Sequence, residues 1–201
     1  MSVSTHVLDF KGEIGRKALH LLALVVPASM LILPFPVALG GLVALSIAAV
    51  ATEVARYFNE TVSQFIDRSF GWMMRPEERG MGKGFTGATW VVVTAALLLG
   101  TFEPRFAAAG MSMTLVGDAA AALVGRTWGA RKWPGSNRTL LGTGAFVVTA
   151  LVIAAFFPSF PWSARAAAAV GAAAAEMLPL RINDNLLLPF VAAGLLTLLA
   201  A

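Results

Sequence analysis

Asp118 is an acidic residue inside an otherwise apolar run, residues 106–124, and a basic segment follows it. A carboxylate at that depth in a membrane-spanning helix is costly in hydrocarbon, so by default it marks a functional site. Asp118 precedes Gly125 by seven residues, which places the carboxylate about 10 Å inside the helix end. Carboxylate oxygen is a ligand that Mg²⁺ prefers. The pattern therefore predicts a metal-bound polyphosphate where an apolar helix meets water.

Cations and glycines that suit a phosphate chain follow Asp118. Phosphoryl transfer needs chiefly a metal on the phosphates, cations around their oxygens and an acceptor held in line. Lys132 and Arg138 are the candidates to hold phosphate oxygens, Arg138 in a bidentate manner. Gly125 and Gly129 form a G-x-x-x-G pair, which is explained either by close helix packing or by backbone access for a nucleotide.

Four carboxylates are expected at the same membrane boundary, because each lies at the cytoplasmic end of a different helix. These are Glu53, Asp118, Glu176 and Asp184, and their convergence predicts a metal and phosphate site. Local explanations exist for two of them. Glu53 can pair with Arg56 at i,i+3, and Asp184 can cap a helix.

Arg16 and His20 share a helix face, because they are four residues apart near the start of the first apolar run. His20 is interpreted either as an interfacial residue with satisfied hydrogen bonds or as a base for an acceptor hydroxyl.

Composition predicts the architecture that positions these residues. The chain has 201 residues, of which 58% are hydrophobic and 13% charged, as is typical of multi-pass membrane proteins. Seven apolar runs approach the ~20 residues that a helix needs to cross a bilayer. We therefore expect an all-α membrane bundle of about seven transmembrane helices, forming a single domain over residues 1–201. The runs cover residues 18–33, 37–58, 85–102, 106–124, 140–157, 162–180 and 186–201.

The distribution of charge predicts the orientation. In a seven-span arrangement, thirteen of the fifteen Lys and Arg residues fall on one side, which places the N-terminus and the long loops in the cytoplasm. The net charge of +4 is then a local feature of that face, and no nucleic-acid partner is expected. The longest connection, residues 57–83, begins with an amphipathic pattern. It predicts an interfacial helix that serves as a structural collar or as a gate for a lipid.

Taken in order, these motifs resemble the polyprenol kinase family, which includes dolichol kinase, phytol kinase and the CTP-dependent diacylglycerol kinase of yeast. The resemblance covers nearly the whole chain. Its elements are Arg16-Lys17-x-x-His20, the stretch 75–89 with Glu78 and Gly-Ala-Thr, Gly117-Asp118 with Gly125 and Gly129, Arg138-Thr139 with Gly142, and Glu176 with Asp184-Asn185 and Pro189.

The resemblance implies a kinase that transfers a phosphoryl group from CTP to the hydroxyl of a membrane lipid alcohol, with a divalent cation such as Mg²⁺. Asp118 would hold the metal with Glu53 or Asp184, and Asp118 or His20 would take the hydroxyl proton. The triphosphate would be positioned by Lys83, Lys132, Arg138 and Thr139.

Two departures from the family pattern stand out. Leu141 occupies the place of the family's glutamate, and Arg138 replaces a lysine. Arg138 keeps the positive charge with a different geometry, whereas Leu141 removes a carboxylate that could bind metal or orient the basic group.

Two other functions are compatible with the sequence. A CTP:phosphatidate cytidylyltransferase has related Gly-Asp and lysine-threonine motifs, but it leaves a CDP-lipid. A non-catalytic transporter or lipid-binding scaffold would bind its ligand without nucleotide turnover. The G-x-x-x-G pair serves contacts within a chain or between chains, so a homo-oligomer is a further expectation.

Overall fold

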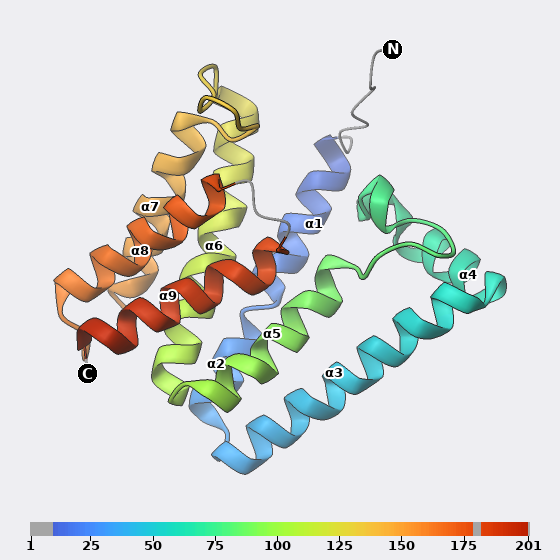
Figure 1. Ribbon diagram of the computed structural model, residues 1–201, viewed down its shortest axis with the longest axis horizontal. Coiled ribbons are helices and arrows are strands. Elements are labelled where there is room, and N and C mark those ends of the chain that lie inside the picture. The colour runs from blue at the N-terminus through green and yellow to red at the C-terminus, as the bar shows by residue number, and fades with distance from the viewer. Residues whose placement is uncertain (1–9, 179–181, 201) are drawn as a thin grey trace.

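The structure is a computed structural model that describes residues 10–178 and 182–200. Within these residues every regular element is helical, and no β-strand is present. The predicted all-α fold is therefore confirmed. Figure 1 shows the helices as a tilted bundle, with α6 between α7 and α1. The elements are α1 (Phe10–Leu22), α2 (Val25–Ile32), α3 (Phe35–Phe58), α4 (Glu60–Phe70), η1 (Gly71–Met73), η2 (Pro76–Glu78), α5 (Gly87–Thr101), α6 (Pro104–Trp128), α7 (Leu140–Ala154), α8 (Trp162–Met177) and α9 (Asp184–Ala200).

Helix α6 is the central element, and it packs against α7, α9, α2 and α1. Small residues allow these close approaches, as they do in membrane bundles generally. A Cβ added at Gly110 would lie 2.7 Å from the Ala193 backbone of α9, and one added at Gly117 would lie 3.0 Å from the Phe146 ring of α7. The α6 face that carries Asp118 is therefore held at short range by its neighbours.

The first apolar run is interrupted, although the sequence predicts one continuous helix there. α1 ends at Leu22 and α2 begins at Val25. Pro27 provides the physical reason, because it has no N–H to donate to Ala23 one turn earlier. Figure 1 shows α1 and α2 as two successive helical segments, with α1 above α2.

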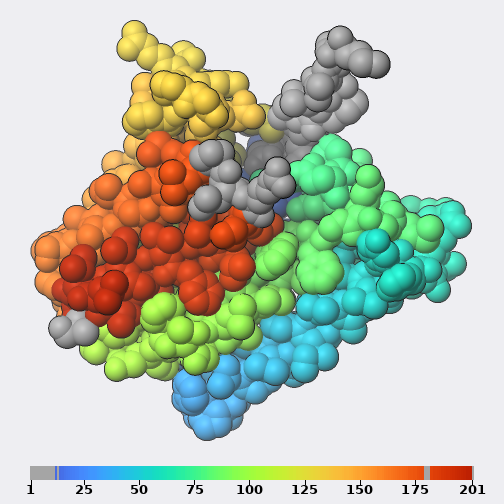
Figure 2. All heavy atoms as spheres, in the orientation of Figure 1, coloured from blue at the N-terminus to red at the C-terminus, as the bar shows by residue number. Residues whose placement is uncertain are grey.

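The amphipathic helix expected after α3 is present as α4. Asn59 caps it by accepting a hydrogen bond from Val62 N at 3.2 Å. Ile66 and Phe70 of α4 line a cavity, whereas Phe65 on another side is exposed. The chain then returns through η1 and η2 to the start of α5. In Figure 2 this return lies at the same end of the molecule as the loop before α7.

Three helical stretches are long and apolar enough to cross a membrane: Ile14–Ile32, Phe35–Phe58 and Pro104–Trp128. α3 is largely unburied, with side chains such as Ile47 at 65% exposure. An apolar helix with that much exposed surface fits a lipid environment. The protein is thus a membrane protein. The shorter apolar helices α5, α7 and α9 have 10–17 residues, so the expected number of seven spans stays a prediction.

Candidate functional site

Asp118 lies just past the middle of α6 and faces α1. Its Oδ2 atom forms an ion pair with the Lys17 ammonium, and the two side chains are only 16% and 4% exposed. The Nε2 atom of His20 lies 3.7 Å from the same carboxylate oxygen. Lys17 and His20 are three residues apart on α1 and so share one face. The structure therefore places His20 and Asp118, the two residues considered as the base, next to each other.

Asn185 connects His20 to two further helices. Its Oδ1 atom lies 3.1 Å from His20 Nε2, and its Nδ2 atom donates to the carbonyl oxygen of Gly87 at 3.2 Å. Because the amide group donates to Gly87, its oxygen faces the histidine, and Nε2 is the nitrogen that carries the proton. Asn185 thereby fixes the orientation of His20, and it joins α9, α1 and α5 at one point.

A short hairpin between α6 and α7 positions Arg138. Its two sides meet at an antiparallel bridge between Lys132 and Thr139, and Trp133 N donates to Arg138 O at 3.0 Å. Gly135 has a φ of +74°, a conformation that glycine adopts without steric cost. The hairpin holds the Arg138 backbone in place and allows its guanidinium to reach α8 and α9.

Arg138 lies between two carboxylates. Its Nη2 atom donates to Asp184 Oδ2 at 2.5 Å, and its Nη1 atom lies 2.9 Å from Glu176 Oε1. Burial disfavours the charged guanidinium, but Glu176, Asp184 and Asp118 outweigh that effect and raise the pKa of Arg138 above its usual value. The side chain is 32% exposed, so it can be reached from the aqueous side.

Glu176 is the least satisfied polar group of this cluster. Its side chain is 1% exposed, and neither carboxylate oxygen has a hydrogen-bond partner among the residues that the structure describes. Arg138 is near enough for an ion pair but is not aligned as a hydrogen-bond donor. A buried carboxylate without hydrogen bonds is costly, so this position favours an additional cation.

The donor set suits a metal held partly by phosphate. Among the residues that the structure describes, no three His, Cys, Asp or Glu side chains are grouped so as to hold a metal ion by themselves. Mg²⁺ in phosphoryl-transfer sites is commonly bound by one or two carboxylates together with phosphates and water. Asp118, Glu176 and Asp184 fit that requirement, because within residues 10–178 and 182–200 the cations paired with them are Lys17 and Arg138.

Glu53 belongs to a separate group, so its expected convergence with Asp118 on one metal is wrong. Its Oε1 atom accepts hydrogen bonds from Thr86 N at 2.8 Å, Thr86 Oγ1 at 2.7 Å and Thr89 Oγ1 at 2.9 Å. Its Oε2 atom lies 2.6 Å from Arg56 Nη2. The i,i+3 ion pair predicted from the sequence is therefore confirmed. Membrane depth alone did not reveal that Glu53 lies on the far side of α5 from Asp118.

Glu78 is the centre of a second ion pair in the same region. Its carboxylate accepts from Arg16 Nη1 at 3.1 and 3.2 Å, from Gly87 N at 3.2 Å and from Arg75 N at 2.9 Å. Arg56 donates to the backbone oxygen of Glu78. These bonds attach the loop between α4 and α5 to α1 and α3. Arg16 and Glu78, both expected near the site, are thus brought together.

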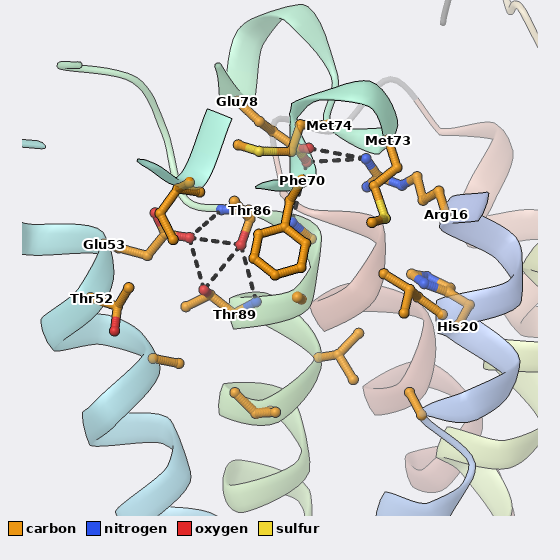
Figure 3. Close-up of a pocket in the computed structure, with 18 of the residues that line it drawn as sticks. Arg16, His20, Thr52, Glu53, Phe70, Met73, Met74, Glu78, Thr86 and Thr89 are labelled. Atoms are coloured by element: carbon orange, nitrogen blue, oxygen red, sulfur yellow. Dashed lines mark hydrogen bonds and ion pairs between the residues drawn. The ribbon is translucent and has the colours of Figure 1, made fainter. Parts of the chain in front are cut away.

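A cavity of about 460 Å³ lies between α1, α3, α4 with η1, and α5. Figure 3 shows Glu53, Thr86 and Thr89 joined on one side of it and Arg16 and Glu78 on the other, with Phe70 between them. His20 lines this cavity and also the small pocket that contains Asp118, Asp184 and Asn185. The histidine therefore stands at the boundary between a largely apolar cavity and the charged cluster.

The glycines expected near a nucleotide are engaged in helix packing. A Cβ at Gly125 would meet Thr139 Oγ1 at 2.7 Å, one at Gly129 would meet the same atom at 2.5 Å, and one at Gly142 would meet Ala121 O at 2.9 Å. Thr139 caps α7 by accepting from Gly142 N at 3.0 Å. The packing explanation accounts for all three glycines, which hold the hairpin of Arg138 against α6.

Three more residues that the sequence analysis singled out lie on the outside of the site. Lys83 and Lys132 are exposed, so they can reach a triphosphate only from the aqueous side. Leu141 is 48% exposed, and its neighbour Gly142 is the residue that packs against α6. A glutamate at position 141 would therefore project away from the α6 face rather than into the contact with it.

Lys17 is the residue of this cluster to which the sequence interpretation gave no role of its own. It was counted as a topology-determining charge and as part of the Arg16-Lys17-x-x-His20 element of the resemblance, but not as a partner of Asp118. Its three-residue spacing to His20 was the available signal, because that spacing puts both side chains on one helix face. Thr86 and Thr89 were also missed as partners of Glu53, and no local pattern indicates a contact across thirty or more positions.

Comparison with known proteins does not test these assignments. No protein-family model matches the sequence, and no solved structure matches it. A protein of Rickettsia prowazekii, described as uncharacterized protein RP860, is 28% identical over 189 residues, which cover 90% of this chain and 91% of that one. The similarity thus extends over nearly the whole of both chains. It brings no function with it, and the resemblance to polyprenol kinases stays a prediction.

Proposed function

We propose that this protein is a CTP-dependent lipid kinase, which transfers the terminal phosphoryl group of CTP to the hydroxyl of a membrane lipid alcohol. The observation that carries the proposal is that His20 lies between two pockets. It lines the apolar cavity and the charged pocket of Asp118 at once, so a lipid hydroxyl in the one would lie beside phosphate in the other.

The charged cluster supplies what phosphoryl transfer requires from a protein. Lys17 and Arg138 are cations close to the Asp118, Glu176 and Asp184 carboxylates. Arg138 would turn from Glu176 to a phosphate oxygen, since planar guanidinium groups bind phosphate bidentately. Such positioning and charge stabilisation provide most of the catalysis in this reaction class.

A bound Mg²⁺ would neutralise phosphate charge and polarise the transferred group. One or two of the Asp118, Glu176 and Asp184 carboxylates are proposed to hold it together with phosphate and water. Among the described residues these three carboxylates are paired with two cations, and Glu176 has no hydrogen-bond partner, which supports this assignment. Lys83 and Lys132 would contact the outer part of the nucleotide from the aqueous side.

His20 is proposed as the proton acceptor in preference to Asp118. The Asp118 carboxylate is already paired with Lys17, whereas His20 reaches the cavity where the acceptor would lie. The hydroxyl oxygen forms a bond to the γ-phosphorus while the bond from that phosphorus to the β–γ bridging oxygen breaks. CDP leaves, the hydroxyl proton passes to His20, and the nearby Asp118 stabilises the resulting imidazolium.

The proposal includes a multi-pass topology with this site on the cytoplasmic face. The first helix, α5, α7 and α9 begin toward one end of the molecule, and α6 ends there (Figure 1). The same end carries the basic residues that favour a cytoplasmic location. α5, α7 and α9 are short for a full crossing, so tilt or local thinning of the bilayer would accompany seven spans.

Two labelled forms of CTP test the proposed reaction. Purified protein is incubated with Mg²⁺ and a long-chain isoprenoid alcohol, diacylglycerol or phosphatidate as separate acceptors, using CTP labelled at the γ- or the α-phosphorus. Label from the γ-position alone in the lipid supports the kinase. Label from the α-position identifies a cytidylyltransferase, and binding of lipid without transfer of either label identifies a non-catalytic lipid-binding protein.

A further inference from the structure

We infer that the cavity between α1, α3, α4 and α5 is the lipid acceptor site, and that it admits a neutral hydroxyl headgroup while excluding an anionic one. Its description as an acceptor site rests on the proposed function. Its preference for an uncharged headgroup rests on the cavity wall alone and is tested without nucleotide.

The form of the cavity suits a hydrocarbon chain that enters from the side. Its volume of about 460 Å³ lies within the range of pockets that bury small organic ligands. Leu19, Leu45 and Phe70 line it and are each between 45% and 48% exposed. These apolar side chains reach both the cavity and the outer surface, so the entrance would face lipid rather than water.

The polar part of the wall is electrically balanced. Arg16 is paired with Glu78 at 3.1 Å, and Arg56 is paired with Glu53 at 2.6 Å. Two cations and two anions therefore line the cavity. Arg56 also donates to the backbone oxygen of Gly84 at 2.8 Å, which uses more of its hydrogen-bonding capacity.

An anionic headgroup would have to break one of these pairs. A phosphate brought beside Arg16 would compete with Glu78, and the displaced carboxylate would be left buried without its cation. Uncompensated buried charge is strongly unfavourable. Such a like-charge conflict is an effective way to discriminate against a wrong ligand.

A hydroxyl group meets no such conflict. It carries no charge, and it requires one acceptor and one donor. The His20 ring at the inner boundary and the Thr89 hydroxyl group on α5 both line the cavity. A hydroxyl beside His20 would also face the pocket of Asp118, where the proposed transfer takes place.

Photoactivatable lipids provide the test. Purified protein without nucleotide is exposed to diacylglycerol or to phosphatidate carrying the same diazirine-labelled acyl chain, and the crosslinked peptides are identified by mass spectrometry. We expect diacylglycerol to label peptides of α3 and α5 that line the cavity, with phosphatidate labelling them much less. Equal labelling of these peptides by both lipids would overturn the inference.

A matched pair of substitutions on α3 locates the bound lipid. Ala49 lines the cavity, whereas its neighbour Ala48 is exposed and does not. Ala49→Trp should reduce labelling of the cavity peptides about tenfold, because the indole occupies the ligand's volume. Ala48→Trp should leave labelling unchanged. If the two variants behave alike, the lipid does not bind in this cavity.

A second pair tests the charge balance. Glu78→Gln removes the anion that neutralises Arg16 and should raise cavity labelling by phosphatidate several-fold. Glu77→Gln removes the same charge from an exposed neighbour outside the cavity and should have no effect. No increase in Glu78→Gln would overturn the charge argument. These measurements need no turnover, so a failure of the kinase assay alone contradicts the proposed function and not the binding preference.

Discussion

Lys17 and Asp118 form a buried ion pair that joins α1 to α6. The pair brings a cation to the carboxylate that the sequence marks most clearly. It also fixes α1 so that His20, one turn further along, faces both the cavity and the charged pocket. The ion pair therefore has two separable roles, one in stability and one in the proposed chemistry.

A double-mutant cycle separates these roles. Asp118→Asn and Lys17→Met should each destabilise the protein by about 3–5 kcal/mol, because each removes one partner of a largely buried ion pair. The double variant should regain much of that stability while remaining inactive in lipid phosphorylation. Thermal unfolding in detergent and transfer from γ-labelled CTP measure the two effects. Activity in the double variant would contradict a chemical role for this pair.

His20 should be required for proton transfer rather than for binding CTP. His20→Gln is expected to lower kcat by about 10²–10⁴-fold, the usual contribution of a general base, with little change in the KM for CTP. Asn185→Ala should have a smaller effect in the same direction, because the ring loses the partner that fixes Nε2 as its protonated nitrogen. Steady-state kinetics provide both parameters. If a His20 variant keeps the full kcat, another group accepts the proton of the lipid hydroxyl.

The glycines of α6 should behave as packing residues. Gly125→Ala brings a methyl group to 2.7 Å from Thr139 Oγ1 and 3.3 Å from Gly142 Cα, so we expect a loss of about 1–3 kcal/mol from overpacking. Gly144→Ala on α7 meets nothing within 4 Å and should be neutral or stabilising by up to about 1 kcal/mol. The melting temperatures of the two variants test whether Gly125 is a packing residue. Equal stability would contradict the packing explanation.

The sequence predicted that charged residues from different helices gather at one end of the bundle, because charge in an apolar helix is costly and tends to be paired. Asp118, Arg138, Glu176 and Asp184 do gather at one end of the bundle. The position of each charged residue around the bundle, at a given depth, was less predictable. Glu53 has the same expected depth as Asp118, yet it bonds to Thr86 and Thr89 in a separate network, since helix order around a bundle depends on long-range packing.

Local sequence also did not reveal the break in the first helix or the contact of Lys17 with Asp118. Pro27 was available as a signal, but apolar composition favoured one continuous span. Lys17 lies beside Arg16 in the sequence, and adjacent residues point in different directions from a helix. One of these cations consequently pairs with Glu78 on the cavity side, and the other pairs with Asp118 on the α6 side.

The requirement for a divalent cation should depend on Asp184 and Glu176 and not on Glu53. Chelation should abolish lipid phosphorylation, and added Mg²⁺ should restore it. Asp184→Asn and Glu176→Gln are each expected to raise the Mg²⁺ concentration for half-maximal activity by about 10–100-fold, as loss of a metal-supporting carboxylate commonly does. Glu53→Gln is the matched control, because in the described part of the chain the partners of its carboxylate are Thr86, Thr89 and Arg56 and none belongs to the Asp118 cluster. It should lower the melting temperature without shifting the Mg²⁺ requirement. A shift in Glu53→Gln equal to that in Asp184→Asn would place the metal on the cavity side of α5 and contradict its assignment to the Asp118 cluster.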